Sequence, residues 1–290
     1  MDEILAGKLR AWAERYNNPR YFAEDPIAFP RRFAQQMTTT QPTLGFEGEQ
    51  WRPCLQDVEI AAVFAAHFAW GRRAMIVRDC SRLFDEMLWR PYDYVMAGSY
   101  RHDSASVHRT VKWSDVAAIC ARLREFYSTP GSGVASEGAT PSNRLASLDP
   151  TTGKAGGPPS YSAEGGMGLR GYTLGRSLEE LSPDGMRVQI FGQKPDPKAA
   201  NKKIWMMRRW MVRRDGKVDL GLWKASDPAD LVIPLDVHVY TQAEALGLCK
   251  RRSKDFATAL EITDSFREIF PGDPAKGDFA LFGYGVTSGR

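Results

Sequence analysis

Two side chains that could do chemistry stand at the first turns of predicted helices. The first is Asp236, which follows the apolar residues 231–235 and precedes an amphipathic stretch with Val239 on its apolar face and Gly247 as C-terminal cap. An aspartate at a helix start accepts backbone N–H hydrogen bonds and lies at the positive end of the helix dipole, so it stays ionised. Asp236 is therefore either a helix cap alone or a cap whose charge also serves a reaction.

The second side chain is Lys202, which begins a helix predicted for residues 202–214 after the turn-rich residues 193–201. One face of this helix is apolar, and another carries Lys202, Arg209 and Arg213. It is either a core helix with a solvated basic face or a helix whose free N–H groups and basic face bind a phosphate backbone. A lysine at its start could act as a nucleophile if it were partly buried beside a carboxylate.

The two helix starts together resemble signatures of the helix-hairpin-helix DNA glycosylases, such as endonuclease III. The segment Pro234-Leu-Asp-Val-His-Val239, followed by Ala245-Leu-Gly-Leu248, is similar to the second signature, with Val237 where threonine is usual. Lys202 is similar in place to the catalytic lysine; Lys203 is adjacent, and alignment on residues 209–213 favours Lys202. The separation of this lysine from the aspartate is closer to that in the archaeal 8-oxoguanine glycosylases than to that in endonuclease III.

A wider resemblance, to a bacterial family of uncharacterised activity in the same superfamily, covers almost the whole chain. It rests on six segments in the same order: Arg15-Tyr-Asn-Asn-Pro19, Asp25-Pro-Ile27, Ala69-Trp-Gly-Arg-Arg73, His108-Arg-Thr110, Arg209-Trp-Met-Val-Arg213 and Asp278-Phe-Ala-Leu-Phe-Gly283. Two features of the superfamily are missing from the sequence. No Leu-Pro-Gly-Val-Gly hairpin precedes Lys202, and no cysteine cluster follows residue 249 to hold an iron–sulfur cluster.

The resemblance implies a DNA glycosylase that flips a damaged or modified base out of double-stranded DNA and cleaves its N-glycosidic bond, leaving an abasic site. Asp236 would stabilise positive charge at the sugar C1′ or deprotonate an attacking water or Lys202. Attack by Lys202 would add strand cleavage as an abasic-site lyase. The base pocket is expected to include Trp70, Arg72, Asp278, Phe279 and Phe282. The DNA-binding residues are expected to be Lys203, Arg209, Arg213 and His238.

Helical periodicity predominates, which favours a mostly α, two-lobed fold of the helix-hairpin-helix glycosylase type. Helices are predicted for residues 3–16, from Asp57, after the interruption at residues 70–73 through Met87, from Ser114 or Asp115, and for residues 256–270, whereas residues 34–55 look irregular. The Gly/Ser/Pro-rich residues 129–171 read as an insertion. One lobe would comprise residues 56–230, the other residues 1–55 plus 235–290, with DNA and the base site in the cleft between them.

The composition is typical of a folded globular protein, with 290 residues, 43% of them hydrophobic, and eight tryptophans. The formal net charge of +4 is mildly basic, and basic residues cluster in residues 198–217 and 250–254. The four cysteines lie far apart, so we expect free thiols, no metal and no other cofactor. Without a signal-peptide pattern or a long apolar window, we expect a monomeric cytoplasmic protein that associates with the bacterial nucleoid and not with a membrane.

Three other functions stay open at the level of sequence. Asp236 and His238 could be half of the metal site of a hydrolase that His67, His102 or His108 completes, although no two histidines have paired ligand spacing. The chain could be a non-catalytic DNA-binding module, against which the retention of Lys202 and Asp236 argues. The insertion could serve a bulkier base, such as glucosylated cytosine in phage DNA, which would make the protein a defence enzyme rather than one that repairs 8-oxoguanine.

Overall fold

The computed structural model describes residues 2–38, 43–44, 50–129 and 175–288. Within these ranges the chain forms eleven α-helices and two short antiparallel hairpins, so the prediction of a mostly α protein is confirmed. The predicted insertion lies outside the described residues except for Thr129. Among the described helices, none combines the length and apolar character that crossing a bilayer requires.

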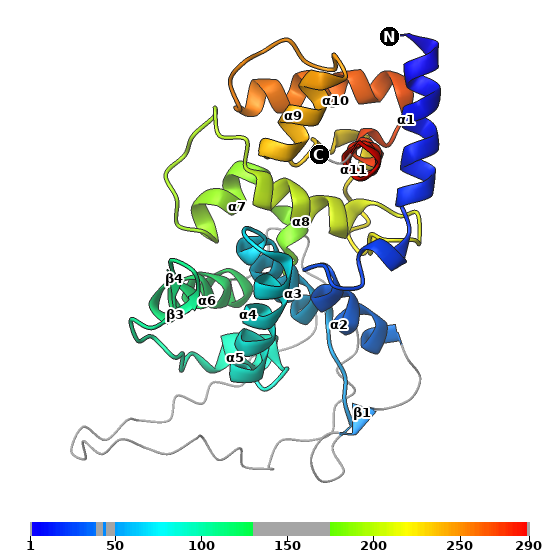
Figure 1. Ribbon diagram of the computed structural model, residues 1–290. Helices are drawn as coiled ribbons and strands as arrows, with labels where there is room; N and C mark the ends of the chain where they lie inside the picture. Colours follow the sequence, from blue (N-terminus) through cyan, green and yellow to red (C-terminus); the bar gives the residue numbers. More distant parts are fainter. Residues whose placement is uncertain (1, 39–42, 45–49, 130–174, 289–290) are drawn as a thin grey trace, which may run out of the picture.

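One group of helices comes from the two ends of the chain and lies at the top of Figure 1. It contains α1 (Glu3–Tyr16), α9 (Val237–Ala245), α10 (Phe256–Ile269) and α11 (Gly277–Thr287). Helix α1 packs along α11, and α11 also packs on α9. The close approach of α1 requires glycine at position 283, because a Cβ there would overlap the Tyr16 ring.

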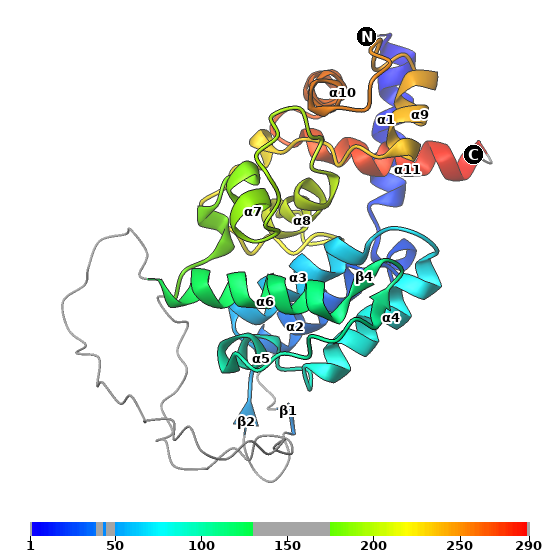
Figure 2. The same ribbon diagram turned by 90° about the vertical axis from the view of Figure 1, so that its left-hand side faces the viewer.

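A second group lies at the bottom of Figures 1 and 2 and surrounds the buried helix α3. It contains α2 (Ala28–Thr38), α3 (Leu55–Phe68), α4 (Arg73–Glu86), α5 (Pro91–Ala97), α6 (Trp113–Ser128) and the hairpins β1–β2 (Thr43–Leu44, Gln50–Trp51) and β3–β4 (Ser106–His108, Val111–Lys112). Asp57 joins two of these helices, because its carboxylate accepts hydrogen bonds from the backbone N–H groups of Cys54 (2.8 Å) and Tyr92 (2.9 Å). The helix therefore begins at Leu55 with Cys54 as its N-cap, earlier than predicted, and Asp57 lies in its first turn and bonds back to the cap residue.

Helix α2 belongs with this second group, which corrects two sequence-based expectations. The helix packs against α3, and its Phe29 stacks on Phe84 of α4 with ring centroids 5.3 Å apart. The N-terminal segment is therefore divided, with α1 in the first group and α2 in the second. Residues 34–38 are helical rather than irregular. The apolar face of α2 is stabilised by packing against α3, which the local sequence does not indicate.

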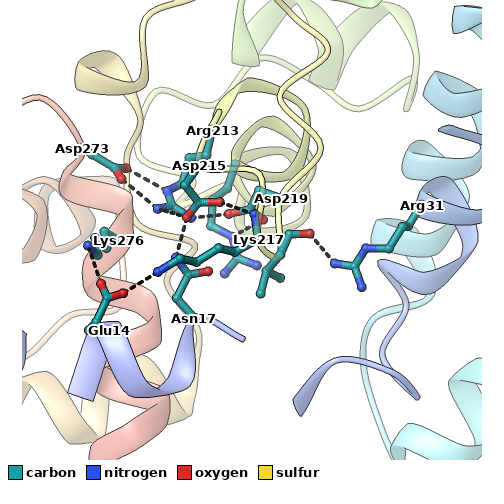
Figure 3. A network of polar contacts seen from close by, with 11 residues as sticks. Glu14, Asn17, Arg31, Arg213, Asp215, Lys217, Asp219, Asp273 and Lys276 are labelled. Atoms are coloured by element: carbon teal, nitrogen blue, oxygen red, sulfur yellow. Dashed lines mark hydrogen bonds and ion pairs between the residues drawn. The ribbon is translucent and has the colours of Figure 1, made fainter. Parts of the chain in front are cut away.

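Helices α7 (Pro183–Gln189) and α8 (Lys202–Val212) lie between the two groups in both views. They pack against each other, and α8 also packs on α3. The segment after α8 ties the groups together, as Figure 3 shows. There Arg213 bonds Asp215, Asp219 and Asp273. From the same segment, Lys217 pairs with Glu14 of α1, and the Val218 carbonyl accepts a hydrogen bond from Arg31 of α2.

Candidate functional site

Lys202 and Asp236 meet in an ion pair, with Nζ of the lysine 3.1 Å from Oδ2 of the aspartate. Each side chain keeps about three tenths of its surface exposed, at 29% and 28% respectively. Lys202 also donates to the Ala69 carbonyl oxygen at 3.4 Å. The lysine is therefore held by two acceptors from different parts of the chain and still reaches solvent.

Local structure at two helix starts aims these side chains at each other. Asp236 is the N-cap of α9, and its Oδ1 accepts a hydrogen bond from the Val239 N–H at 2.8 Å, which leaves Oδ2 for the lysine. The helix ends as predicted, with Gly247 at φ 70° and its N–H bonded to the Glu244 carbonyl. Lys202 is the first residue of α8, preceded by Asn201 in a left-handed conformation at φ 46°.

The ion pair lies in the wall of a pocket of about 430 Å³, which forms where the two helix groups meet α8. Its lining comes from the segment before α2, the α3–α4 turn, and helices α4, α8, α9 and α11. The lining residues that bear on its chemistry are Phe22, Asp25, Arg73, Lys202, Met206, Arg209, Asp236, His238, Asp278, Phe279 and Phe282. A pocket of this size and mixed character is within the usual range for small-molecule sites.

Two further carboxylates in the pocket are each paired with an arginine. Asp25 Oδ2 lies 3.7 Å from Arg73, and Asp278 accepts a hydrogen bond from Arg209. Burial raises the pKa of Asp25 above its ordinary value, against the nearby arginines and the hydrogen bond from the Ile27 N–H. Burial also raises the pKa of Asp278, helped by the charges of Asp236 and Asp219 and opposed by Arg209 and Lys202. Both groups are thus more readily protonated than an exposed aspartate.

Three aromatic rings from segments near the start and end of the chain form part of the apolar lining. Phe22 meets Phe279 edge to face at 5.5 Å and Phe282 at 5.6 Å between ring centroids. Phe282 is partly exposed in the pocket, whereas Phe279 is 1% exposed and lies beneath the guanidinium of Arg209 at 4.8 Å. The predicted pocket residues Asp278, Phe279 and Phe282 therefore come together in one cavity with Lys202 and Asp236.

Trp70 and Arg72 do not line this pocket, although they were expected to. Trp70 lies in the α3–α4 turn with its ring edge against His108 at 5.4 Å, and Arg72 is the exposed N-cap residue of α4. The neighbouring Arg73 and the backbone of Gly71 take their place in the lining. The turn contributes to the pocket through Gly71 and Arg73, whereas Trp70 and Arg72 lie outside its lining. The sequence pattern does not specify which residues of the turn face the pocket.

Arg209 and Arg213 were predicted to bind DNA, and the structure corrects this expectation. They are only 4% and 1% exposed. Arg209 pairs with Asp219 and Asp278, and Arg213 with Asp215, Asp219 and Asp273. A guanidinium that is enclosed by several carboxylates cannot reach a phosphate, so these residues organise the protein instead.

Lys203 lines a second pocket of about 270 Å³, which Lys202 of the ion pair also lines. Its neighbours there include His67, Arg187 and Asn201, and no acidic residue is in the lining. Burial, with the charge of Lys202, lowers the pKa of Lys203 to about 8. Arg187 is fixed by a 2.8 Å hydrogen bond to the Asn201 side chain. The predicted DNA-binding residue Lys203 thus belongs to a cationic cluster.

Of the four histidines, only His238 lines the first pocket, where it is exposed one residue after the α9 start. His108 is buried and bonded to Asp79 and to the Trp70 carbonyl. Burial lowers the pKa of His67 to about 3, so its imidazole is neutral. In the part of the chain that the structure describes, no group of three or more His, Cys, Asp or Glu side chains could hold a metal ion.

Asp25, Arg73 and Phe22 complete the pocket but were not among the predicted site residues. Asp25 and Arg73 belong to two segments of the wider resemblance, Asp25-Pro-Ile27 and Ala69-Trp-Gly-Arg-Arg73, so the sequence held a signal for both residues. The role of Phe22 depends on how α1 and α11 pack, and no local pattern indicates it.

Comparison with known proteins places the chain in a family. No curated protein and no solved structure matches it. Residues 52–150 and 168–287 match the family described as "Protein of unknown function (DUF2400)". The matched residues make up well over half of the chain, and the interruption falls within the predicted insertion. The chain belongs to this family.

Proposed function

We propose that this protein is a DNA glycosylase that excises a damaged or modified base. The observation that carries the proposal is the 3.1 Å ion pair between Lys202 and Asp236 in the wall of a pocket with an aromatic side. Cleavage of an N-glycosidic bond develops positive charge at C1′, and a fixed carboxylate stabilises such charge. The aromatic rings of Phe22 and Phe282 suit the flat face of a base that has left the duplex stack.

Two routes use the same pair of residues. In the hydrolytic route, Asp236 takes a proton from water while the water oxygen bonds to C1′, and the base leaves with the electron pair of the C1′–N bond and is protonated from solvent. In the lyase route, Asp236 takes a proton from the ammonium of Lys202, Nζ bonds to C1′, and the base leaves with the electron pair of the C1′–N bond and is protonated from solvent. The resulting N,O-acetal opens when the C1′–O4′ bond breaks and O4′ takes the proton from Asp236, which gives a Schiff base from which strand cleavage can follow.

The elements around the pair support contact with DNA. Helices α7 and α8 pack against each other, are joined by residues 190–201 and present Lys202 at the start of the second helix. The cationic cluster of Lys203 and Arg187 adjoins that start, where helix N–H groups also favour an anion. A phosphate of the strand carrying the flipped nucleotide fits this side of α8.

The pocket volume bears on which base is removed. At about 430 Å³ it can hold an oxidised purine or a base with a bulky polar substituent. Asp25 and Asp278 offer acceptors to such a substituent, and Arg73 offers donors. Glucosylated cytosine of phage DNA is therefore a second candidate substrate beside 8-oxoguanine.

Borohydride trapping tests the chemical part of the proposal. Wild-type protein and Lys202→Gln are incubated with duplexes carrying 8-oxoguanine, uracil, alkylated purines or glucosylated hydroxymethylcytosine. A covalent adduct with the wild type that Lys202→Gln fails to form would establish the lyase route. Base release without an adduct would establish the hydrolytic route. DNA binding without release from any duplex would favour a non-catalytic binding module.

A further inference from the structure

His108 is completely buried, and both of its ring nitrogens face hydrogen-bond acceptors. Nδ1 lies 2.8 Å from Oδ2 of Asp79 on α4, and Nε2 lies 3.1 Å from the carbonyl oxygen of Trp70 in the α3–α4 turn. The ring also stacks on Phe68 at the end of α3, with centroids 5.1 Å apart. One side chain of the β3–β4 hairpin thus connects the turn, the helix before it and the helix after it.

The two acceptors determine the protons on the ring. A carbonyl oxygen only accepts, so Nε2 carries a proton. The Asp79 carboxylate also accepts from Arg78 at 2.8 Å, so it faces Nδ1 as a hydrogen-bond acceptor. The His108 ring therefore bridges two acceptors, and its Nε2 donor to Trp70 is the contact that holds the turn.

The turn that His108 holds contributes directly to the proposed site. The carbonyl of Ala69, the residue before Trp70, accepts the 3.4 Å hydrogen bond from Lys202, and Gly71 lines the pocket. Arg109 holds the same turn from its other side, with its guanidinium 4.6 Å from the centre of the Trp70 ring. Gly71 adopts φ 107°, and a Cβ at this position would lie 2.8 Å from that guanidinium.

We propose that Asp79 and His108 form a positioning pair that holds the α3–α4 turn so that the Ala69 carbonyl fixes the Lys202 amine beside Asp236. The inference rests on the proposed function, because it assigns the pair to the base-release step. His108 contacts neither substrate nor the reacting atoms in this account, so its effect passes through the turn. Small displacements of a reacting group have large effects on rate, which makes such a pair measurable.

Two substitutions of His108 separate the two hydrogen bonds. The amide nitrogen of glutamine reaches the place of Nε2 and can still donate to Trp70, whereas that of asparagine takes the place of Nδ1 and can donate only to Asp79. Asp79→Asn leaves the ring able to donate from Nε2 to the Trp70 carbonyl while Nδ1 accepts from the new amide, so it should act like His108→Gln. His102→Asn is the control, since His102 is an exposed histidine on the preceding loop.

Single-turnover base release and duplex affinity are measured for each variant. We expect release at least about tenfold slower in His108→Asn, with duplex affinity unchanged. We expect His108→Gln and Asp79→Asn to stay within about threefold of the wild type, because both keep the donor to Trp70. Equal rates in His108→Asn and His108→Gln would overturn the proposal, and so would a rate in Asp79→Asn as low as that in His108→Asn. If His108→Asn does not fold, His108→Leu, which also lacks the donor, replaces it in the comparison with His108→Gln.

A second readout separates this inference from the proposed function. Reductive methylation of Lys202, followed by peptide mass spectrometry with the exposed Lys198 as internal reference, reports the restraint on the amine without any DNA. Methylation should be at least about threefold faster in His108→Asn than in the wild type, His108→Gln and Asp79→Asn. If methylation follows this pattern but the protein releases no base, the positioning pair is supported and the proposed glycosylase activity is rejected. Unchanged methylation in all variants would reject the pair.

Discussion

Lys202 and Asp236 each combine a structural contact with the proposed chemical one. Asp236 caps α9 through Oδ1 and faces Lys202 through Oδ2, so one carboxylate serves both the helix and the pocket. Asparagine caps a helix about as well as aspartate but cannot carry the charge. Substitution by asparagine therefore separates the structural contact of this residue from its chemistry.

Lys203 differs from its neighbour because it lies half-buried in a cluster without acidic residues. Its pKa of about 8 means that the ammonium is charged at neutral pH and loses its proton just above it. We predict that wild-type affinity for duplex DNA falls as the pH rises from about 7 to about 9, as Lys203 loses its attraction for phosphate. Lys203→Arg should remove most of this dependence, because a guanidinium stays charged.

Fluorescence anisotropy over that pH range measures the effect. Lys198→Arg, at an exposed position before α8, is the matched control and should retain the wild-type dependence. An identical fall in affinity for Lys203→Arg and the wild type would show that another group titrates.

Among the elements, α3 is joined to three neighbouring segments by the buried carboxylate of Glu59. Glu59 accepts hydrogen bonds from Ser177 Oγ and the Leu178 N–H, from Trp223 Nε1 at 2.8 Å and from Tyr127 Oη at 2.8 Å. These donors come from the end of α6, the segment before α7 and the loop after α8. Burial raises the pKa of Glu59 to about 7 in spite of the four donors.

This raised pKa gives a pH-dependent stability with a definite sign. Between the ordinary value of 4.5 and about 7, the folded state holds a proton that the unfolded state has lost. The contribution of Glu59 to the free energy of unfolding is therefore fully present below this window and falls as the pH rises through it. Glu59→Gln should lack this fall, so its stability relative to the wild type should increase with pH across the window.

Chemical denaturation at several pH values tests this prediction, with Glu125→Gln on the exposed surface of α6 as control. Glu59→Ala, which leaves four donors without their acceptor, should lose about 3–5 kcal/mol below this window, and the loss should become smaller as the pH rises through it. A pH profile of Glu59→Gln parallel to that of the wild type would refute the role assigned to this carboxylate.

The elements differ in how far local sequence specifies them. The helices at residues 3–16 and 256–270 were predicted because their caps and apolar periodicity agree, and they form as α1 and α10. Helix α11 was not predicted, because its residues are apolar or small on almost every side and give no stripe. Helix α7 was missed for a different reason, since seven residues beginning with a proline resemble a turn.

The same distinction applies to the site. Lys202 and Asp236 each mark a helix start, so their places were predictable, although the 3.1 Å distance between them was not. Asp25 lies in the same pocket only because the segment before α2 packs near α4 in the folded protein. This tertiary contact has no local sequence signal. Arg209 and Arg213 were misplaced because a basic stripe on a helix has the same sequence pattern in solvent and against buried carboxylates.

For the whole molecule, the network around Arg213 fixes the segment after α8, which contacts the first helix group through Glu14 and the second through Arg31. The Arg213 guanidinium bonds Asp219 at 2.5 Å, Asp273 at 2.7 Å and Asp215 at 2.9 Å, and the side chain of Asp219 is fully buried. The pocket lies between the groups that this network holds together, so the network also maintains the site.

Arg213→Met leaves these carboxylates without their cation. We predict a loss of about 3–5 kcal/mol in the free energy of unfolding, the usual result when one member of a buried ion pair is removed. Arg267→Met is the control, because Arg267 pairs with Asp264 on the exposed surface of α10 and should change stability by less than about 1 kcal/mol. Equal losses in urea denaturation for the two variants would contradict the importance given to the network.

The most direct test of the central claim is base release by the wild type, Asp236→Asn and Asp255→Asn on the panel of modified duplexes. Asp255 caps α10 as Asp236 caps α9, but it lies outside the pocket, so it controls for capping alone. We predict that the wild type releases a modified base, that Asp255→Asn releases it at the same rate, and that Asp236→Asn is slower by at least about a hundredfold. Release by Asp236→Asn at the wild-type rate would contradict the account, as would the absence of release from every duplex to which the wild type binds.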